Sequence, residues 1–157
     1  MPKAILNSEF EITYPDSFHE MDEKEISQAN YYGEKPKLCL KDPENHIIIS
    51  FAFKKYGALA AALAGQKGTA ESMQKKVSAL MKNYGYSLTG FCTQKTGEYT
   101  ADGFDYRYDA QGISMAAKSL VLKTGRTYYY IHCYYRQELA DESLKIIDDI
   151  LSGIKQA

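Results

Sequence analysis

The stretch SLVLKTGRTYYYIHCYYR, residues 119–136, decides the fold because it contains two strand-like segments joined by a tight turn. β-Branched and aromatic residues are frequent in both segments, and such residues favour strands. Between the segments, Thr124-Gly125 is a dipeptide typical of a two-residue hairpin turn. Around this turn the sequence predicts four facing pairs: Val121 with Tyr128, Ser119 with Tyr130, Ala117 with His132, and Met115 with Tyr134.

A second predicted hairpin precedes the first, with Gln111-Gly112 as its turn. Its strands form three facing pairs: Tyr108 with Met115, Tyr106 with Ala117, and Phe104 with Ser119. Because successive side chains of a strand point to opposite faces, the two hairpins together define one aromatic sheet face. That face holds Phe104, Tyr106, Tyr108, Met115, Val121, Tyr128, Tyr130, His132 and Tyr134. On the opposite face, we expect Asp105 to pair with Lys118 across the strands.

The rest of the chain completes an α+β fold, and we expect a single domain over residues 1–157. Periodic apolar residues predict helices near 22–32, 70–84 and 140–155. Alternating residues predict further strands at 10–15, within 37–55 and at 86–94, which gives a mostly antiparallel sheet of six to seven strands. The alanine-rich run 58–64 is interpreted as a short helix or a mobile flap. Five residues are predicted to lie in the core: Val77, Leu80, Ile131, Ile147 and Leu151.

Two local patterns predict where the first helix begins and where the 37–55 hairpin turns. Asp22 and Glu25 have the spacing of a capping box at the start of the first helix. Asp42-Pro43-Glu44-Asn45 has the composition of a four-residue loop inside the 37–55 hairpin. That loop predicts two facing pairs, Leu40 with Ile47 and Leu38 with Ile49.

The bulk composition excludes some classes of function. The 157 residues carry a net charge of -1, which argues against nucleic acid as a partner, because phosphate binding needs clustered Lys and Arg. The longest small apolar run, 58–64, is far too short to cross a membrane. Three cysteines, Cys39, Cys92 and Cys133, cannot all pair within one chain and lie in apolar strand-like runs. Free thiols and a first segment without a signal-peptide core predict a cytoplasmic protein, although a chain whose export signal had been removed would read the same way.

The order of these segments resembles that of the Mog/PsbP-like superfamily, which includes the DcrB-like bacterial proteins. The resemblance is carried by the opening FEITYP at 10–15, ADGFDYRYDAQG at 101–112, the hairpin 119–136 and the closing ESLKIIDDILSGI at 142–154. It implies an α/β/α sandwich around an antiparallel sheet. Members of the superfamily are mainly binding or assembly factors: a Ran-binding nuclear transport factor, a photosystem subunit, and chaperones for secreted bacterial effectors. No catalytic residues come with the resemblance.

The sequence contains no recognisable catalytic or metal motif. His19, His46 and His132 lie in unrelated contexts without the spacing of a zinc site, so we predict no metal and no cofactor. Cys133 follows His132 directly and therefore points to the other sheet face, which excludes a nucleophile–base pair between them.

Two hypotheses for function remain. In the first, a non-catalytic binding or assembly module holds a protein segment or an apolar ligand in a groove beside the run 58–64, lined by Tyr106, Tyr128, Tyr130, His132 and Tyr134. In the alternative, a small enzyme is centred on His132 and the neighbouring tyrosines. A third reading makes the tyrosines structural, with helices covering the face and only the hydroxyls reaching its rim.

Overall fold

Two antiparallel sheets and four α-helices make up the part of the chain that the structure, a computed structural model, describes: residues 1–28 and 34–157. The large sheet has the strand order β3-β4-β5-β9-β8-β7-β6. Its strands are β3 (His19–Glu20), β4 (Leu38–Asp42), β5 (Ile47–Lys55), β6 (Ser87–Thr96), β7 (Tyr99–Ala110), β8 (Ile113–Thr124) and β9 (Thr127–Arg136). The small sheet joins β1 (Lys3–Leu6), β2 (Phe10–Thr13) and β10 (Lys155–Gln156).

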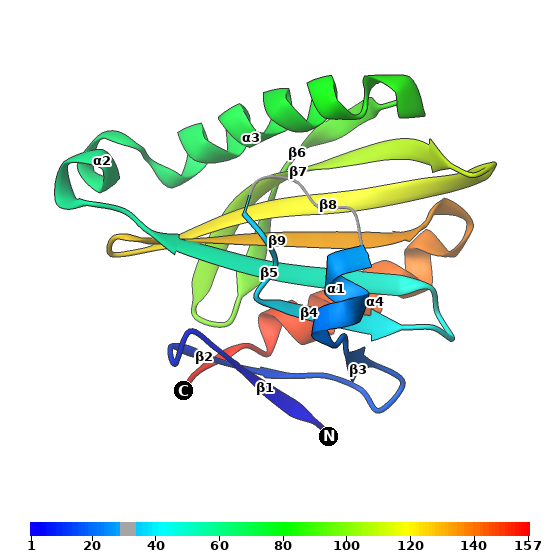
Figure 1. Ribbon diagram of the computed structural model, residues 1–157, viewed down its shortest axis with the longest axis horizontal. Helices are drawn as coiled ribbons and strands as arrows, with labels where there is room; N and C mark the ends of the chain where they lie inside the picture. The colour runs from blue at the N-terminus through cyan, green and yellow to red at the C-terminus, as the bar shows by residue number, and fades with distance from the viewer. Residues whose placement is uncertain (29–33) are drawn as a thin grey trace.

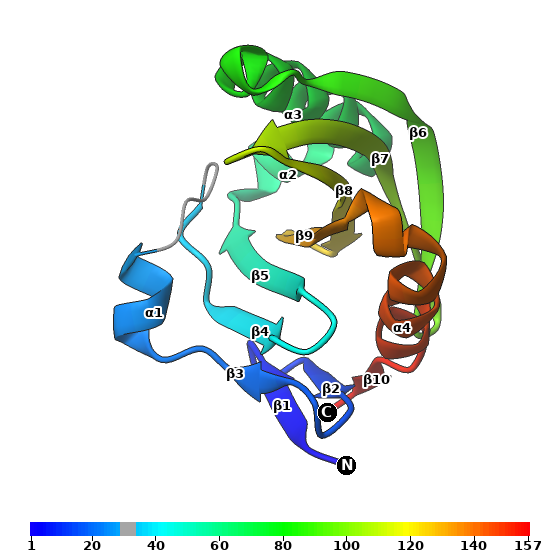
Figure 2. The same ribbon diagram turned by 90° about the vertical axis from the view of Figure 1, so that its right-hand side faces the viewer.

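Helices cover both faces of the large sheet, as Figures 1 and 2 show. On one face α3 (Gln66–Leu80) lies along β7 and β8, with the short α2 (Ala58–Leu63) just before it. On the other face, α4 (Ala140–Ser152) packs together with the small sheet. The predicted α+β class and the mostly antiparallel sheet are confirmed.

The main hydrophobic core lies between the large sheet, α4 and the small sheet. Ile131 on β9 and Ile147 and Leu151 on α4 are almost completely buried there, as predicted. A smaller core lies under α3, where Val77 and Met81 pack on Phe104 and Tyr106. Burying apolar surface on both faces explains why the central strands carry so few solvated side chains.

One predicted core residue is wrong: Leu80 is 58% exposed. The predicted helix 70–84 is observed as α3 followed by a 3₁₀ turn at Lys82–Tyr84, so the helix begins earlier and ends earlier than expected. Within this segment Ala70, Val77 and Met81 are the buried apolar side chains. Around the helix axis, Leu80 lies to one side of the row formed by these three residues, so its side chain is not on the face that packs against the sheet.

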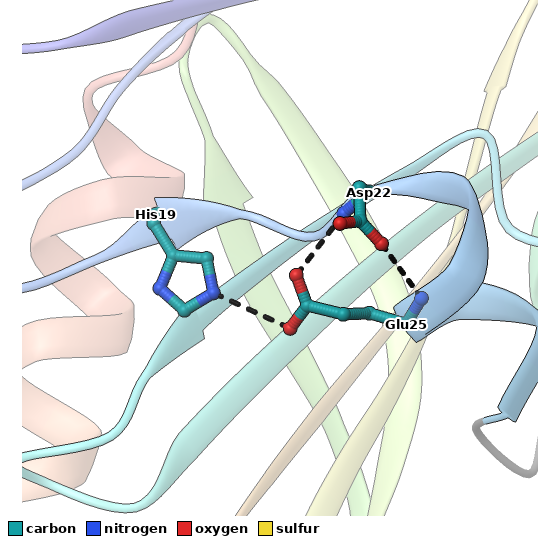
Figure 3. A network of polar contacts seen from close by, with 3 residues as sticks. All are labelled: His19, Asp22 and Glu25. Carbon is teal, nitrogen blue, oxygen red and sulfur yellow. Dashed lines mark hydrogen bonds and ion pairs between the residues drawn. The ribbon is translucent and has the colours of Figure 1, made fainter.

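The first helix, α1 (Glu23–Gln28), begins where the sequence predicts. The backbone N–H of Glu25 donates to Asp22 Oδ1 at 2.8 Å, and the N–H of Asp22 donates back to Glu25 Oε1 at 3.3 Å. This reciprocal pair is the expected capping box, and Figure 3 shows it together with His19, whose Nε2 lies 3.5 Å from Glu25 Oε2. The predicted continuation of this helix over 29–32 lies outside the described residues.

The two long hairpins have the predicted faces, but only one has the predicted register. All three expected pairs of the β7–β8 hairpin are observed, and Lys118 forms an ion pair with Asp105 at 3.1 Å. In the β8–β9 hairpin the turn is Gly125-Arg126, one residue later than expected, and Gly125 has φ 61°. A glycine with positive φ at the first central position is typical of a type II′ turn. The facing pairs therefore become Val121 with Tyr130, Ser119 with His132, Ala117 with Tyr134, and Met115 with Arg136.

The β4–β5 hairpin differs from the prediction in the same way. Its facing pairs are Leu40 with Ile49 and Leu38 with Phe51, so residues 43–46 form the loop. Asp42 is fully buried, and its Oδ1 accepts hydrogen bonds from the backbone N–H groups of Glu44 and Asn45, both at 3.1 Å. Asp42 is thus the last residue of the strand, and its side chain stabilises the loop because an Asp at this position mimics a backbone turn.

Candidate functional site

A surface cavity of about 360 Å³ lies on the α3 face of the large sheet, where α3 no longer covers β9 and β5. One wall is α3, and the other consists of β9, the end of β5 and Tyr56 just after it. Eleven described residues line it: Glu34, Lys54, Tyr56, Thr69, Ser72, Met73, Lys76, Val77, Leu80, Tyr130 and His132. We call this feature the α3–β9 cavity.

The position of the cavity follows from strand pairing. Ala52 and Lys54 of β5 face Tyr130 and Tyr128 of β9. Their side chains therefore share the face that carries the aromatic row. The helix α3 packs mainly on β7 and β8 and not on β9 and β5. The ring of Tyr130 is thus left half-buried rather than covered.

Two tyrosine hydroxyls meet at this wall. The Tyr56 and Tyr130 hydroxyl oxygens lie 3.1 Å apart in a hydrogen bond. The Tyr56 ring also packs edge-on against Tyr128 with ring centroids 4.9 Å apart. Burial, followed by the hydrogen bond with Tyr56, raises the pKa of the Tyr130 hydroxyl well above its ordinary value. Tyr130 is therefore a neutral hydroxyl group and not a general base at physiological pH.

His132 lines the cavity although its side chain is almost completely buried. Its side chain is 6% exposed, and its Nδ1 lies 2.7 Å from the Oγ of Ser119 in a hydrogen bond. Burial lowers the pKa of His132 to about 4, so the imidazole is neutral at pH 7. Because Nδ1 is engaged, the remaining ring nitrogen, Nε2, is the one that can meet a ligand.

The Ser119–His132 pair has the atoms of a nucleophile and its base but not their accessibility. Ser119 is 0% exposed and lies on β8, the strand between β7 and β9. A nucleophilic serine must reach a substrate carbonyl, which a fully enclosed hydroxyl cannot do. The hydrogen bond instead satisfies two buried polar groups and fixes the orientation of the imidazole.

Among the described residues that line the cavity, the charged side chains are those of Glu34, Lys54 and Lys76. Lys54 pairs with Glu34 at 3.4 Å, and its Nζ lies 5.3 Å from the centre of the Tyr56 ring. Lys76 is exposed on α3 and forms no ion pair within residues 1–28 and 34–157. The walls behind these groups are the apolar side chains of Met73 and Val77 and the tyrosine rings.

The five residues predicted to line a groove divide into three groups. Tyr130 and His132 line the cavity. Tyr106 and Tyr128 are 1% exposed and belong to the packed cores under α3 and α2. Tyr134 is half-buried with its ring stacked on His132, the centroids 6.3 Å apart.

The alanine-rich run 58–64, predicted as a short helix or a mobile flap beside the groove, is a short helix and is not among the residues that line the cavity. It folds as α2, and its Ala61 packs on Val121 and Tyr128. The Tyr128 hydroxyl donates to the carbonyl oxygens of Ala61 and Ala64. The facing wall is α3, and sequence reasoning missed Tyr56, which continues the β5 alternation of Ala52 and Lys54 by two residues.

No protein-family model matches the sequence. A search of curated proteins also finds no match.

Solved structures do resemble this chain. The cyanobacterial PsbP protein CyanoP from Synechocystis sp. PCC 6803 superposes with a TM-score of 0.68 and 11% identity, over 99% of this chain and 92% of CyanoP. LpqN, involved in cell envelope biogenesis of Mycobacterium tuberculosis, gives 0.52 and 14%, over 94% and 83% of the two chains. A protein from Bacteroides thetaiotaomicron gives 0.61 and 11% over 94% of this chain, which spans about half, 45%, of that protein's length.

These likenesses show that the chain has a PsbP-like fold. At 11% to 14% identity they show the fold alone, and the site must be argued from its own residues. No helix in the described part of the chain is both long enough and apolar enough to span a membrane.

Proposed function

We propose that the protein is a non-catalytic binding or assembly module that holds an apolar group of another molecule in the α3–β9 cavity. The observation that carries this proposal is the half-buried Tyr130 ring, which lines the cavity together with Met73 and Val77 around a space that no described side chain fills. Tyrosine offers a flat apolar surface at low entropic cost and a hydroxyl at its end, which suits binding sites. A volume near 360 Å³ lies at the small end of the range for small-molecule sites, about 300–1,000 Å³.

The enzymatic alternative centred on His132 has less support. The hydrogen-bond partner of His132 is an enclosed serine, and the depressed pKa makes the imidazole a weak base near pH 7. Two further statements belong to the proposal. The sequence pattern supports kinship with the DcrB-like bacterial proteins, and the three unpaired cysteines support a location in a reducing cytoplasm.

The test is binding of a neutral apolar probe, 2-phenylethanol, followed by NMR with ¹³C-labelled methyl groups of methionine, valine and leucine. We expect saturable shifts of Met73, Val77 and Leu80 methyl signals in the wild type. Tyr130→Ala should weaken the binding about tenfold or more, because the ring that covers one side of the probe is gone. The matched control is Tyr84→Ala, which removes a 55% exposed tyrosine that does not line the cavity and should leave the affinity unchanged.

Absence of saturable shifts at those three residues would overturn the proposed function. Equal losses for Tyr130→Ala and Tyr84→Ala would do the same, because they would place the bound probe elsewhere. Circular dichroism and thermal unfolding of each variant establish that the fold is intact before affinities are compared.

A further inference from the structure

The α3–β9 cavity is not purely apolar, since Nε2 of its lining residue His132 forms no hydrogen bond with any described residue. His132 is 94% enclosed, Ser119 occupies its Nδ1, and no hydrogen bond reaches Nε2 from the described residues. A purely apolar ligand that displaced water from Nε2 would leave this nitrogen unsatisfied, which costs roughly 1–3 kcal/mol. The ligand that suits the cavity therefore places a polar atom against His132.

The charges at the mouth determine which polar group fits. Two lysines, Lys54 and Lys76, and one glutamate, Glu34, line the cavity. Glu34 pairs with Lys54, so the charge that remains uncompensated among the described lining residues is that of Lys76. A flexible lysine side chain can reach across a cavity mouth, and its ammonium group attracts anions. A negatively charged head group is thus favoured over a neutral or a positive one.

The remaining walls determine the body of the ligand. Met73 and Val77 on α3 face Tyr130 and Tyr56 across the cavity. A thioether, a branched aliphatic side chain and two aromatic rings favour a compact apolar group. The Thr69 and Ser72 hydroxyls on the same helix add hydrogen-bonding groups at the edge of the cavity.

We infer that the α3–β9 cavity binds a small carboxylate with a compact apolar body, its carboxylate held by His132 Nε2–H and Lys76. This inference rests on the proposed function, to which it adds the chemical class of the ligand. The tautomer with a proton on Nε2 is the one in which the Ser119 hydroxyl donates to Nδ1, and it presents a donor to the carboxylate. Hydrogen bonds to an ionised group are about twice as strong as neutral ones, so the head group contributes selectivity as well as affinity.

The test compares phenylacetate with 2-phenylethanol, which have the same aromatic body and differ in the charged group. At low salt we expect phenylacetate to bind the wild type about tenfold more tightly, with a change in the His132 Nε2 ¹⁵N shift that 2-phenylethanol does not reproduce. Lys76→Gln should weaken phenylacetate about three- to tenfold and leave 2-phenylethanol unchanged. The matched control is Lys75→Gln, an exposed neighbour on α3 that does not line the cavity and should alter neither affinity.

The outcomes distinguish failure of the carboxylate inference from failure of the proposed function. If 2-phenylethanol binds at the cavity and phenylacetate binds no more tightly, the carboxylate inference is wrong while the proposed function stands. If Lys75→Gln weakens phenylacetate as much as Lys76→Gln does, the attraction is a general surface charge effect and the inference is again overturned. If neither compound shifts the cavity signals, both the inference and the proposed function fail.

Discussion

At the scale of the residue, His132 shows how burial decides chemistry. Its cross-strand neighbours are Ser50 on β5 and Ser119 on β8, and its ring stacks on that of Tyr134. No carboxylate is in hydrogen-bond contact with it among the described residues. Without a negative partner, desolvation alone acts on the imidazole and lowers its pKa to about 4. The same side chain beside an aspartate would be a base with an elevated pKa, so the sequence neighbourhood of His132 says little about its reactivity.

The first prediction concerns stability at acid pH. An unfolded chain has an ordinary histidine pKa near 6.5, so between pH 6.5 and 4 it binds a proton that the folded chain resists. The stability contributed by neutral His132 is therefore present above pH 6.5 and lost as the pH falls toward 4. Urea unfolding at pH 7 and pH 4.5 should show that the wild type loses about 2 kcal/mol more between these pH values than His132→Gln does.

The control for this prediction is His46→Asn. His46 is exposed in the β4–β5 loop with φ 57°, a left-handed conformation that asparagine tolerates. Its variant should keep the wild-type dependence on pH, because the substitution leaves His132 and its buried surroundings unchanged. A His132→Gln variant that loses as much stability as the wild type on acidification would contradict the assignment of this effect to His132.

At the scale of the element, the hairpins show what the sequence can and cannot predict. Gln111-Gly112 was placed correctly because the two residues have φ 52° and 80°, the left-handed pair that a type I′ turn needs. Gly125 can instead serve as the second residue of one turn or the first residue of another, and both choices suit its neighbours. Moving a two-residue turn by one position shifts the pairing by two residues, which preserves the faces and changes only the partners.

For the candidate site too, the sequence predicted the sheet face of the residues but not their surroundings. Alternation along β9 correctly placed Tyr128, Tyr130, His132 and Tyr134 on one face, because that depends on the strand alone. Which of these rings is covered depends on where α3 crosses the twisted sheet, and that is set by packing among Val77, Met81 and Tyr106. No local pattern of the helix encodes the crossing position, so the cavity had to come from the structure.

The second prediction compares two glycines in the hairpin turns at opposite ends of β7, Gly97 in the β6–β7 turn and Gly112 in the β7–β8 turn. Gly97 and Gly112 have φ 64° and 80°, so alanine at either position costs about 1–2 kcal/mol for the backbone alone. At Gly112 a new Cβ would meet nothing within 4 Å, but at Gly97 it would lie 2.1 Å from the carbonyl oxygen of Ile154. We expect Gly97→Ala to lower the free energy of unfolding by roughly 1–3 kcal/mol more than Gly112→Ala, measured by urea unfolding.

The larger loss expected for Gly97→Ala follows from the contact between the β6–β7 turn and α4. The Gly97 backbone N–H donates to the carbonyl oxygen of Leu151 at 3.1 Å, so the β6–β7 turn is joined to the end of α4. An added Cβ forces the two apart and loosens the last turn of the helix. Similar losses for the two variants would mean that the contact relaxes without cost and that the turn and α4 are not firmly joined.

At the scale of the whole molecule, the large sheet is covered on both faces, but unequally. The α4 face is closed by a helix and a second sheet, which together bury apolar side chains of β1, β2, β4, β5, β8 and β9. The α3 face has a narrower cover, and its aromatic side chains reach from the core to the surface. Tyrosine suits a position between core and surface because its ring is apolar and its hydroxyl is polar. The concentration of tyrosines in β9 is thus explained partly by packing and partly by the cavity at its edge.

The third prediction concerns the three thiols, which lie in three different strands of this doubly covered sheet. Burial raises the pKa of Cys39 and Cys92 to about 11 and that of Cys133 to about 12. Because the thiolate is the reactive form, a pKa of about 11 makes a thiol about a hundredfold less ionised at pH 8 than one with the ordinary value of 9.0. We expect slow reaction with a disulfide reagent in the folded protein and rapid reaction of all three thiols after unfolding without reductant.

Exposure should set the order of reaction in the folded state. Cys92 is half-buried on the edge strand β6, whereas Cys39 and Cys133 are buried, so pulse alkylation and mass spectrometry should find Cys92 modified first. The ammonium of Lys118, 3.6 Å from the Cys92 sulfur, also favours its thiolate, although burial outweighs this effect. A count of one thiol after unfolding would instead reveal a disulfide, which would contradict the three free cysteines and remove the argument for a reducing compartment. Equal modification of all three in the folded protein would show that the sheet opens as a whole before any single thiol becomes accessible.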